Sequence, residues 1–207
     1  MVGGGSGRRF GSVKQYETLG DRRVIDHARA AAEAVSDGTV VVVPASDAER
    51  ERGVAGGESR SASVRAGLAV VPADATMILV HDAARPFADA ALFRRVIGAV
   101  RDGADGAIPG LPVADTIKVI DGRRVVVDTP DRATLVAVQT PQGFRADVLR
   151  SAHGGDSEAT DDSALVERAG GRVVVVAGDH DNRKITRPED LEWARAILAA
   201  RANGGET

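Results

Sequence analysis

A glycine-rich stretch with cationic side chains opens the chain. Four of the five residues in 3–7 are glycine, and Arg8, Arg9 and Lys14 follow. Glycines let backbone N–H groups close on an anion without side chains in the way. The pattern suits a triphosphate, although a flexible chain start would have the same composition. Two better-known phosphate loops are absent: no Gly-Lys pair occurs here, and Arg8 and Phe10 stand where G-x-G-x-x-G needs glycine.

A second polar cluster, residues 81–86, directly follows a predicted buried strand. The carboxylate of Asp82 can hold Mg²⁺, the usual companion of a nucleoside triphosphate. Arg85 can bind a phosphate through two parallel hydrogen bonds. The alternative is an aspartate that caps a turn and pairs with the arginine. His81 has no partner in sequence, so we assign it to structure.

A third polar cluster, residues 179–191, lies between the last predicted strand and the last predicted helix. Asp181 could be a second metal ligand, and Lys184 a cation at the reacting phosphorus. The alternative is a solvated charged loop in which Thr186 caps the helix.

Strands and helices alternate along the chain, which predicts α/β architecture with a mostly parallel sheet. β-Branched or apolar runs predict strands over 39–43, 76–81, 106–109, 136–139 and 172–176. Helices are predicted over 24–35, 60–71, 88–101, 145–153, 160–168 and 188–201. In such a sheet, ligands bind beyond the carboxyl ends of the strands, where the second and third clusters lie.

A β-hairpin interrupts this alternation. Residues 116–120 and 124–128 flank a turn at Asp121-Gly122, which is a strong hairpin signal. The hairpin is too short to be a domain, so we expect residues 112–135 to project as an arm from a single domain spanning 1–207.

Composition excludes several functional classes. Lysine and arginine number 27 against 30 aspartates and glutamates, which argues against nucleic-acid binding by bulk charge. Cysteine is absent, so disulfides, thiolate metal sites and cysteine nucleophiles are excluded. The apolar runs are of strand length, and no signal peptide is evident, so we expect a cytoplasmic protein that does not bind membranes.

Eight short motifs occur in order along the chain. They are Gly3-Gly4-Gly5-Ser6-Gly7-Arg8-Arg9 with Lys14-Gln15, residues 56–64, residues 81–86, Asp115-Thr116-Ile117-Lys118, Asp131-Arg132, residues 139–144, residues 160–164 and residues 182–191. Each motif is weak or moderate alone, but their joint order is highly specific and covers essentially the whole chain. In this order they closely resemble the 2-C-methyl-D-erythritol 4-phosphate cytidylyltransferase family.

The resemblance implies a Rossmann-like nucleotidyltransferase fold, a homodimer joined by the hairpin arm, and a Mg²⁺-dependent reaction. The phosphate of the methylerythritol phosphate acceptor would attack the α-phosphorus of CTP, and pyrophosphate would leave. A phosphate nucleophile is already anionic near neutral pH, so no strong general base is needed. The difficulty is repulsion between anions, which explains why the candidate residues are lysine, arginine and aspartate.

The resemblance also implies a role for each site residue. Arg9, Lys14 and Lys184 would be catalytic, with Arg9 and Lys14 on the triphosphate and Lys184 at the α-phosphate. Asp82 and Asp181 would hold the metal. The nucleotide-binding residues would be Gly3, Gly4, Gly5, Gly57, Ser63, Asp82 and Ala83. The acceptor would contact Arg85, Thr140 and Lys184 of one subunit, with Thr116 and Arg132 from the partner's arm.

The chain departs from the family at its start. The family places a full hydrophobic strand before the glycine loop, whereas only Met1 and Val2 precede it here. We therefore expect the first strand to be missing, with unpaired backbone groups and a gap in the core. Val13 also stands where the family commonly has proline, and the spacing from Arg9 to Lys14 is short.

Three other functions stay open. A cytidylyltransferase acting on ribitol phosphate would share most of these motifs. A non-catalytic, N-terminally truncated nucleotide-binding protein would bind CTP without turnover. An NAD-binding reductase would need the dinucleotide glycine fingerprint that the chain lacks.

Overall fold

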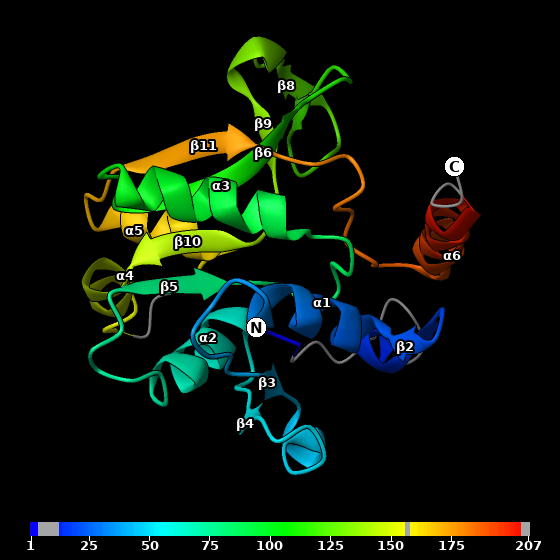
Figure 1. Cartoon of the computed structure of the whole chain (residues 1–207). Helices are drawn as coiled ribbons and strands as arrows, with labels where there is room; N and C mark the ends of the chain where they lie inside the picture. Colours follow the sequence, from blue (N-terminus) through cyan, green and yellow to red (C-terminus); the bar gives the residue numbers. More distant parts are fainter. Residues whose placement is uncertain (4–12, 156–157, 204–207) are drawn as a thin grey trace.

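The computed structural model describes residues 1–3, 13–155 and 158–203. A sheet with the strand order β11-β6-β10-β5 forms its centre, and helices cover both faces (Figure 1). The strands are β1 Thr18–Leu19, β2 Arg22–Arg23, β3 Val42–Val43, β4 Val54–Ala55, β5 Met77–Val80, β6 Gly106–Pro112, β7 Val119–Ile120, β8 Val126–Asp128, β9 Val136–Val138, β10 Gln142–Arg145 and β11 Val173–Ala177. The helices are α1 Val24–Glu33, α2 Arg60–Leu68, α3 Ala90–Arg101, α4 Ala146–Ala152, α5 Asp162–Arg168 and α6 Pro188–Asn203.

The α/β architecture is confirmed, and β5, β6 and β11 of the central sheet run in one direction while β9 and β10 run in the opposite direction. β11 runs parallel to β6, and β3 runs parallel to β4. β10 is antiparallel to both β5 and β6, so β5 and β6 share one direction. Val2 forms parallel bridges to Val42 and to Asp82, which joins the β3–β4 pair to the end of β5.

The sequence patterns did not predict β10, which lies between β5 and β6. Its four residues include a glycine and contain no β-branched residue. A Cβ atom at Gly143 would lie 2.6 Å from Cγ1 of Val96, so glycine is what lets α3 approach the strand this closely. Tertiary packing rather than local propensity makes this segment a strand.

All six predicted helices are present, and three begin at the expected kind of residue. The side chains of Ser59, Asp89 and Asp161 accept hydrogen bonds from backbone N–H groups at the starts of α2, α3 and α5. Such caps satisfy N–H groups that have no partner within the helix. None of the helices in the described part of the chain is long and apolar enough to cross a bilayer.

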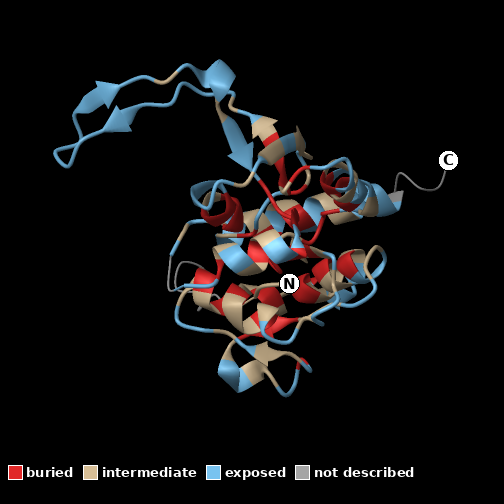
Figure 2. Ribbon diagram, turned by 90° about the vertical axis from the view of Figure 1, so that its left-hand side faces the viewer, coloured by how far each residue is buried: buried red, intermediate tan, exposed pale blue. Residues whose placement is uncertain are grey.

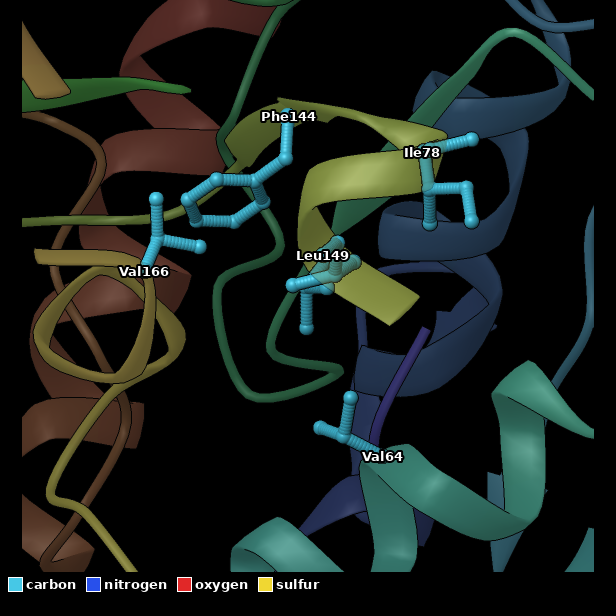
Figure 3. Close-up of a cluster of buried hydrophobic side chains, with 7 residues drawn as sticks. Val64, Ile78, Phe144, Leu149 and Val166 are labelled. Atoms are coloured by element: carbon cyan, nitrogen blue, oxygen red, sulfur yellow. The ribbon is translucent and has the colours of Figure 1, made fainter. Parts of the chain in front are cut away.

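Two layers of apolar side chains bury the sheet. On one face, Ile78 and Val80 of β5 pack with Val64 of α2, Phe144 of β10 and Leu149 of α4 (Figure 3). On the other face, Met77 and Leu79 of β5 pack against α3 and its neighbours. Successive side chains of β5 therefore enter opposite layers, as in any strand that is buried on both sides.

The hairpin projects from the body of the protein, as the sequence predicted. β7 and β8 pair with each other, and Figure 2 shows them far from the buried core, on a long excursion coloured as exposed. The arm displays apolar side chains, because Val119, Ile120, Val126 and Val127 are all more than two-fifths exposed.

The first described residues of the chain pair with both β3 and the end of β5. Val2 and Gly3 donate 2.7 Å hydrogen bonds to the carbonyls of His81 and Val42, and Val42 donates to the carbonyl of Met1 at 2.8 Å. The predicted strands over 39–43 and 76–81 are shorter in the structure, at Val42–Val43 and Met77–Val80.

Candidate active site

Asp82 and Lys184 lie together at the carboxyl end of β5. Nζ of Lys184 donates a 2.6 Å hydrogen bond to Oδ2 of Asp82, although 102 residues separate them in sequence. The Asp82 side chain is nearly buried, whereas that of Lys184 is 41% exposed. The lysine ammonium is thus anchored to a fixed carboxylate while remaining accessible to a ligand.

Two contacts hold the loop that carries Lys184. Asn182 is fully buried, and its Nδ2 donates a 2.8 Å hydrogen bond to the carbonyl of Thr140. The backbone N–H of Ile185 donates to the carbonyl of Ala84 at 2.8 Å, and the Ile185 side chain is buried. Lys184 therefore extends from a short segment that is fixed on both sides.

The charges around Asp82 keep its carboxylate ionised. Burial alone would raise the pKa of Asp82, but the positive charges of Lys184, Arg60 and Arg85 outweigh it and lower the pKa from 3.8 to about 2. Nε of Arg60 lies 3.7 Å from Oδ1. Asp82 is therefore anionic throughout the neutral range, as a metal ligand or a lysine anchor must be.

This pKa predicts a specific acid sensitivity. Because the folded-state pKa of Asp82 lies below its unfolded value, its stabilising effect is present above about pH 4 and is lost as the pH falls through about 2. Asp82→Asn should therefore reduce the free energy of unfolding by about 2 kcal/mol at pH 6, with the deficit shrinking toward pH 2. Urea titrations at several pH values measure this. A constant deficit, or the same pH trend in Asp74→Asn at an exposed loop residue, would contradict it.

A buried ionic network holds the Arg60 side chain beside Asp82. Nη1 of Arg60 lies 2.7 Å from Oδ2 of Asp162, and Oδ1 of Asp162 lies 3.0 Å from Nε2 of His153. The side chains of Asp162 and His153 are each only 1% exposed. None of these three residues was predicted to belong to the site, although Arg60 and Asp162 stand within two of the motifs. Their arrangement fixes the guanidinium that faces Asp82.

Arg85 provides a second buried cation at the site. Its Nη1 donates a 2.7 Å hydrogen bond to the carbonyl of Asn182, while its Nε is buried without a partner in the described structure. Burial lowers the pKa of Arg85, with Asp82 acting in the opposite direction. A guanidinium with one neutral partner and a spare donor is suited to an anionic ligand.

Thr140 is buried beside Asp82 and positions it. Its hydroxyl accepts a 3.0 Å hydrogen bond from the backbone N–H of Asp82 and lies 3.1 Å from Nδ1 of His81. Nε2 of His81 donates to the carbonyl of Arg85, and burial lowers the His81 pKa to about 4. The ring is thus neutral, and Nδ1 accepts from Thr140. This confirms a structural role for His81, while direct contact between Thr140 and an acceptor stays a prediction.

Gly3 and Ala83 lie side by side at the start of the glycine loop. A Cβ atom at Gly3 would lie 3.2 Å from that of Ala83, so a larger residue would crowd this position. Nε2 of the buried Gln15 donates a 2.6 Å hydrogen bond to the carbonyl of Gly3. Gly4, Gly5 and Arg9 lie outside the described residues, whereas Lys14 begins a short 3-10 helix just after them.

Gly57 and Ser63 also come together. The Ser63 hydroxyl donates to the carbonyls of Ser59 and Gly57 at 2.9 and 3.3 Å. A Cβ atom at Gly57 would lie 2.5 Å from that of Ala62, so only glycine fits this turn into α2. Ser63 thereby fixes the path of the backbone that leads to Arg60.

The remaining predicted residues lie elsewhere in the single chain. Oδ2 of Asp181 accepts a 2.8 Å hydrogen bond from Arg201, and no group of three or more acidic or histidine side chains that could hold a metal is present among residues 1–3, 13–155 and 158–203. Thr116 and Arg132 are exposed on the arm, where Nη1 of Arg132 bonds the carbonyl of Ala114 at 2.7 Å.

Comparisons with known proteins agree on one family. The family model described as 2-C-methyl-D-erythritol 4-phosphate cytidylyltransferase matches residues 1–200. The protein of that name from Nocardia farcinica is 47% identical, over 96% of this chain and 92% of its own length. The one from Rubrobacter xylanophilus is 44% identical, over 99% of this chain and 96% of its own length. The crystal structure of that name from Thermus thermophilus superposes with a TM-score of 0.81 at 33% identity, covering 96% of this chain and 97% of its own. The chain therefore belongs to the 2-C-methyl-D-erythritol 4-phosphate cytidylyltransferase family.

Proposed function

We propose that this chain transfers the cytidylyl group of CTP to 2-C-methyl-D-erythritol 4-phosphate, giving 4-diphosphocytidyl-2-C-methyl-D-erythritol and pyrophosphate in isoprenoid precursor biosynthesis. The observation that supports it most is the pairing of Lys184 with Asp82, flanked by Arg60 and Arg85, at the carboxyl end of β5. These are the charges that a reaction between two phosphates needs, in a family that carries this name. We also propose that the enzyme acts in the cytoplasm.

In the proposed reaction, an oxygen of the acceptor phosphate forms a bond to the α-phosphorus of CTP. The bond from that phosphorus to the bridging oxygen of the β-phosphate breaks, and its electron pair leaves with pyrophosphate. The acceptor oxygen is already anionic, so no side chain needs to remove a proton. Lys184, partly exposed and held by Asp82, is placed to stabilise negative charge on the α-phosphate.

Asp82 is the residue that fits a Mg²⁺ ion best. Its carboxylate is ionised by its cationic neighbours, and Mg²⁺ is commonly bound by one or two carboxylates together with substrate phosphates. Asp181 has an arginine partner and would have to exchange it to contribute. When bound, the ion would neutralise charge on the triphosphate.

We assign the nucleotide to the region around Gly3, Ala83, Gly57 and Ser63, with Gly4, Gly5, Arg9 and Lys14 completing the triphosphate contacts. Gly3 and Gly57 pack closely against Ala83 and Ala62 and carry no side chain that would cover the backbone beside them. We assign the acceptor to Arg85, Thr140 and Lys184, because Arg85 carries an unused buried donor.

We further propose that residues 1–207 form one nucleotidyltransferase domain and that residues 112–135 are the dimerisation arm. Val119, Val126 and Val127 are 43%, 53% and 59% exposed in a single chain, and cover by a second subunit would remove this apolar surface from water. Such an arm would bring Thr116 and Arg132 of the partner subunit to the acceptor.

The arm assignment predicts the effect of a charge placed on it. Val126→Asp should convert the dimer to a monomer, because an unpaired carboxylate cannot be buried between subunits. Light scattering during gel filtration measures the mass, and circular dichroism checks that the fold is retained. Val70→Asp, at an exposed valine outside the arm, should leave the mass unchanged. A Val126→Asp variant that keeps the dimer mass would rule out the arm as the interface.

Arg132→Ala should affect the KM of the acceptor much more than the KM of CTP. If Arg132 contacts only the acceptor, its loss should raise the acceptor KM by about tenfold or more, while the KM for CTP stays within about twofold. Steady-state pyrophosphate release with each substrate varied measures both constants. Arg124→Ala, also on the arm, is the matched control. Equal losses for both substrates would contradict the acceptor assignment.

The function itself is tested by mass spectrometry of the product from CTP, Mg²⁺ and each of two acceptors. We expect the CDP-alcohol from methylerythritol phosphate, at a kcat/KM well above that for ribitol 5-phosphate. A preference for ribitol phosphate would identify the alternative enzyme. CTP binding without product from either acceptor would identify a non-catalytic nucleotide-binding protein.

A further inference from the structure

The arm is paired at its base and toward its tip, but not between them. β6 pairs with β9 at the base, and β7 pairs with β8 toward the tip. The two segments in between, residues 113–118 and 129–135, form the neck of the arm, within the long exposed excursion of Figure 2. In the described structure, no main-chain hydrogen bond crosses from one segment of the neck to the other. The ladder that normally fixes two strands against each other is therefore interrupted here.

Two side-chain hydrogen bonds cross the neck instead. Near the base, Nη1 of Arg132 donates to the carbonyl of Ala114 at 2.7 Å. At the other end, Nζ of Lys118 donates to the hydroxyl oxygen of Thr129 at 2.7 Å. Thr116 lies midway between Ala114 and Lys118 in the sequence. The two bonds therefore fix how the segment that carries Thr116 lies against the segment that carries Arg132.

Binding of an acceptor changes the first of these bonds but not the second. A guanidinium that binds a phosphate through two parallel hydrogen bonds turns its planar fork toward that ligand. Arg132 would then share or give up its bond to Ala114. The bond between Lys118 and Thr129 uses neither of the residues that we assign to the acceptor. It can therefore hold the neck both before and after the acceptor binds.

Lysine is an uncommon cation in this chain. Lys14, Lys118 and Lys184 are the three lysines among 27 lysines and arginines, and Lys14 and Lys184 both belong to the proposed site. An ammonium is a compact charge whose three donors turn freely, whereas a guanidinium is a wide planar fork. A single contact with one hydroxyl suits the ammonium. The composition and the contact both indicate that the lysine at position 118 serves a specific partner.

The bond between Lys118 and Thr129 lies at the surface, so it adds little to the stability of the fold. Both residues are exposed, and water competes for the ammonium and for the hydroxyl. Thr116 and Arg132 are exposed as well, on the same unpaired segments. Loss of the bond should therefore change where Thr116 and Arg132 lie relative to each other, rather than whether the protein folds.

We propose that Lys118 is a positioning residue for the acceptor. Its bond to Thr129 holds the two sides of the neck together, so that Thr116 and Arg132 of one subunit meet the acceptor of the other subunit as a pair. The inference rests on the proposed function and adds Lys118 and Thr129 to it. Small displacements of groups that hold a substrate have large effects on its reaction, which is why a weak surface bond can matter here.

The test uses the full chain and breaks the bond from each side. Lys118→Met keeps the aliphatic stem and removes the ammonium, whereas Thr129→Val keeps the shape and removes the hydroxyl. Each variant should raise the acceptor KM by about fivefold, with kcat and the KM for CTP within about twofold. The double variant should be no worse than either single variant, because both changes break the same bond. Steady-state pyrophosphate release with each substrate varied measures these constants.

Two further variants serve as controls. Thr129→Ser retains the hydroxyl, so its acceptor KM should stay within about twofold of the unsubstituted chain. Arg123→Met removes an exposed cation from the turn of the hairpin, outside the neck. It should also leave the acceptor KM within about twofold, which separates positioning from general attraction of an anionic acceptor to the arm. Light scattering during gel filtration should give every variant the mass of the unsubstituted protein.

Several results would overturn the proposal. A raised acceptor KM in Lys118→Met with a normal value in Thr129→Val would mean that the ammonium contacts the acceptor itself. A double variant whose effect is the product of the two single effects would mean that the residues act independently. An equal rise in Arg123→Met, unchanged constants in both single variants, or a change of mass would also contradict positioning by this bond.

The failure of this inference can be told apart from the failure of the proposed function. If the unsubstituted chain makes no product from either acceptor, the proposed function is wrong and the role of Lys118 falls with it. If the unsubstituted chain turns over methylerythritol phosphate and the variants match it, only the role of Lys118 is refuted.

Discussion

Lys184→Ala should lower kcat for pyrophosphate release by about 10²–10³-fold while the protein stays folded. The ammonium group is the accessible cation that Asp82 holds at 2.6 Å, and its removal leaves charge on the α-phosphate less well stabilised in the transition state. Because the side chain is 41% exposed, its truncation leaves no large cavity in the core. Steady-state kinetics together with a urea titration separate the catalytic from the structural effect.

Arg183→Ala is the matched control for this result. Arg183 is the exposed neighbour of Lys184 in the same loop, and its guanidinium stacks 4.8 Å from the ring of Trp193 rather than on the site. Its loss should leave kcat within about threefold, since surface substitutions usually have small effects. Normal turnover by folded Lys184→Ala protein would remove Lys184 from the mechanism.

Asp162→Asn should destabilise the protein by about 3–5 kcal/mol, the usual effect of removing one partner of a buried ion pair. Asp162 is the anion between Arg60 and His153, and its side chain is 1% exposed. In this variant, Asp82 is the remaining acidic partner of the Arg60 guanidinium within the described network. Its carboxylate is farther away, with Oδ1 at 3.7 Å from Nε of Arg60. Urea titration at pH 7 measures the free energy of unfolding.

Two further variants show whether charge burial is the cause. The double variant Arg60→Met with Asp162→Leu removes both charges and should recover a large part of the stability lost in Asp162→Asn. Asp147→Asn breaks the exposed Arg145 pair, which is of similar length, and should cause no measurable change. If the double variant loses as much free energy of unfolding as the sum of the losses for Arg60→Met alone and Asp162→Leu alone, the two residues do not act as a charge pair.

Catalysis at this site depends on the charge of Asp82. Its carboxylate is nearly buried, yet the nearby cations keep its pKa near 2, so it can hold a cation in the ground state without taking up a proton. Lys184 can then exchange this carboxylate for a phosphate oxygen. Arg85, with its unused donor, provides a second positive group for the acceptor. The site thus offers fixed charge rather than an acid–base pair.

Local sequence patterns predicted most of the helices and strands, because apolar periodicity and helix capping depend on residues that are close together in sequence. Apolar periodicity and capping residues such as Ser59 and Asp161 indicate helices wherever packing agrees with propensity. β10 was not predicted, because the strand character of a segment that contains Gly143 arises from its neighbours β5 and β6 and from the close approach of α3.

The site was predictable where single residues carry the chemistry. Asp82, Lys184 and Arg85 were identified from motifs, and the structure brings all three together. The contact of Arg60 with Asp162 joins positions 102 residues apart, as the contact of Lys184 with Asp82 does, but no motif linked the first pair to chemistry. The pairing of Asp181 with Arg201 could not be foreseen either, because it depends on how α6 packs against the loop.

The stereochemical course at the α-phosphorus shows whether the acceptor phosphate attacks in line. The chain is supplied with Mg²⁺, methylerythritol phosphate and one diastereomer of CTP in which sulfur replaces an oxygen on the α-phosphorus. The configuration of the product is read by ³¹P NMR after comparison with both standards. We expect inversion, the outcome of a single displacement. Retention would require a covalent intermediate on the protein and would contradict direct attack by the acceptor phosphate.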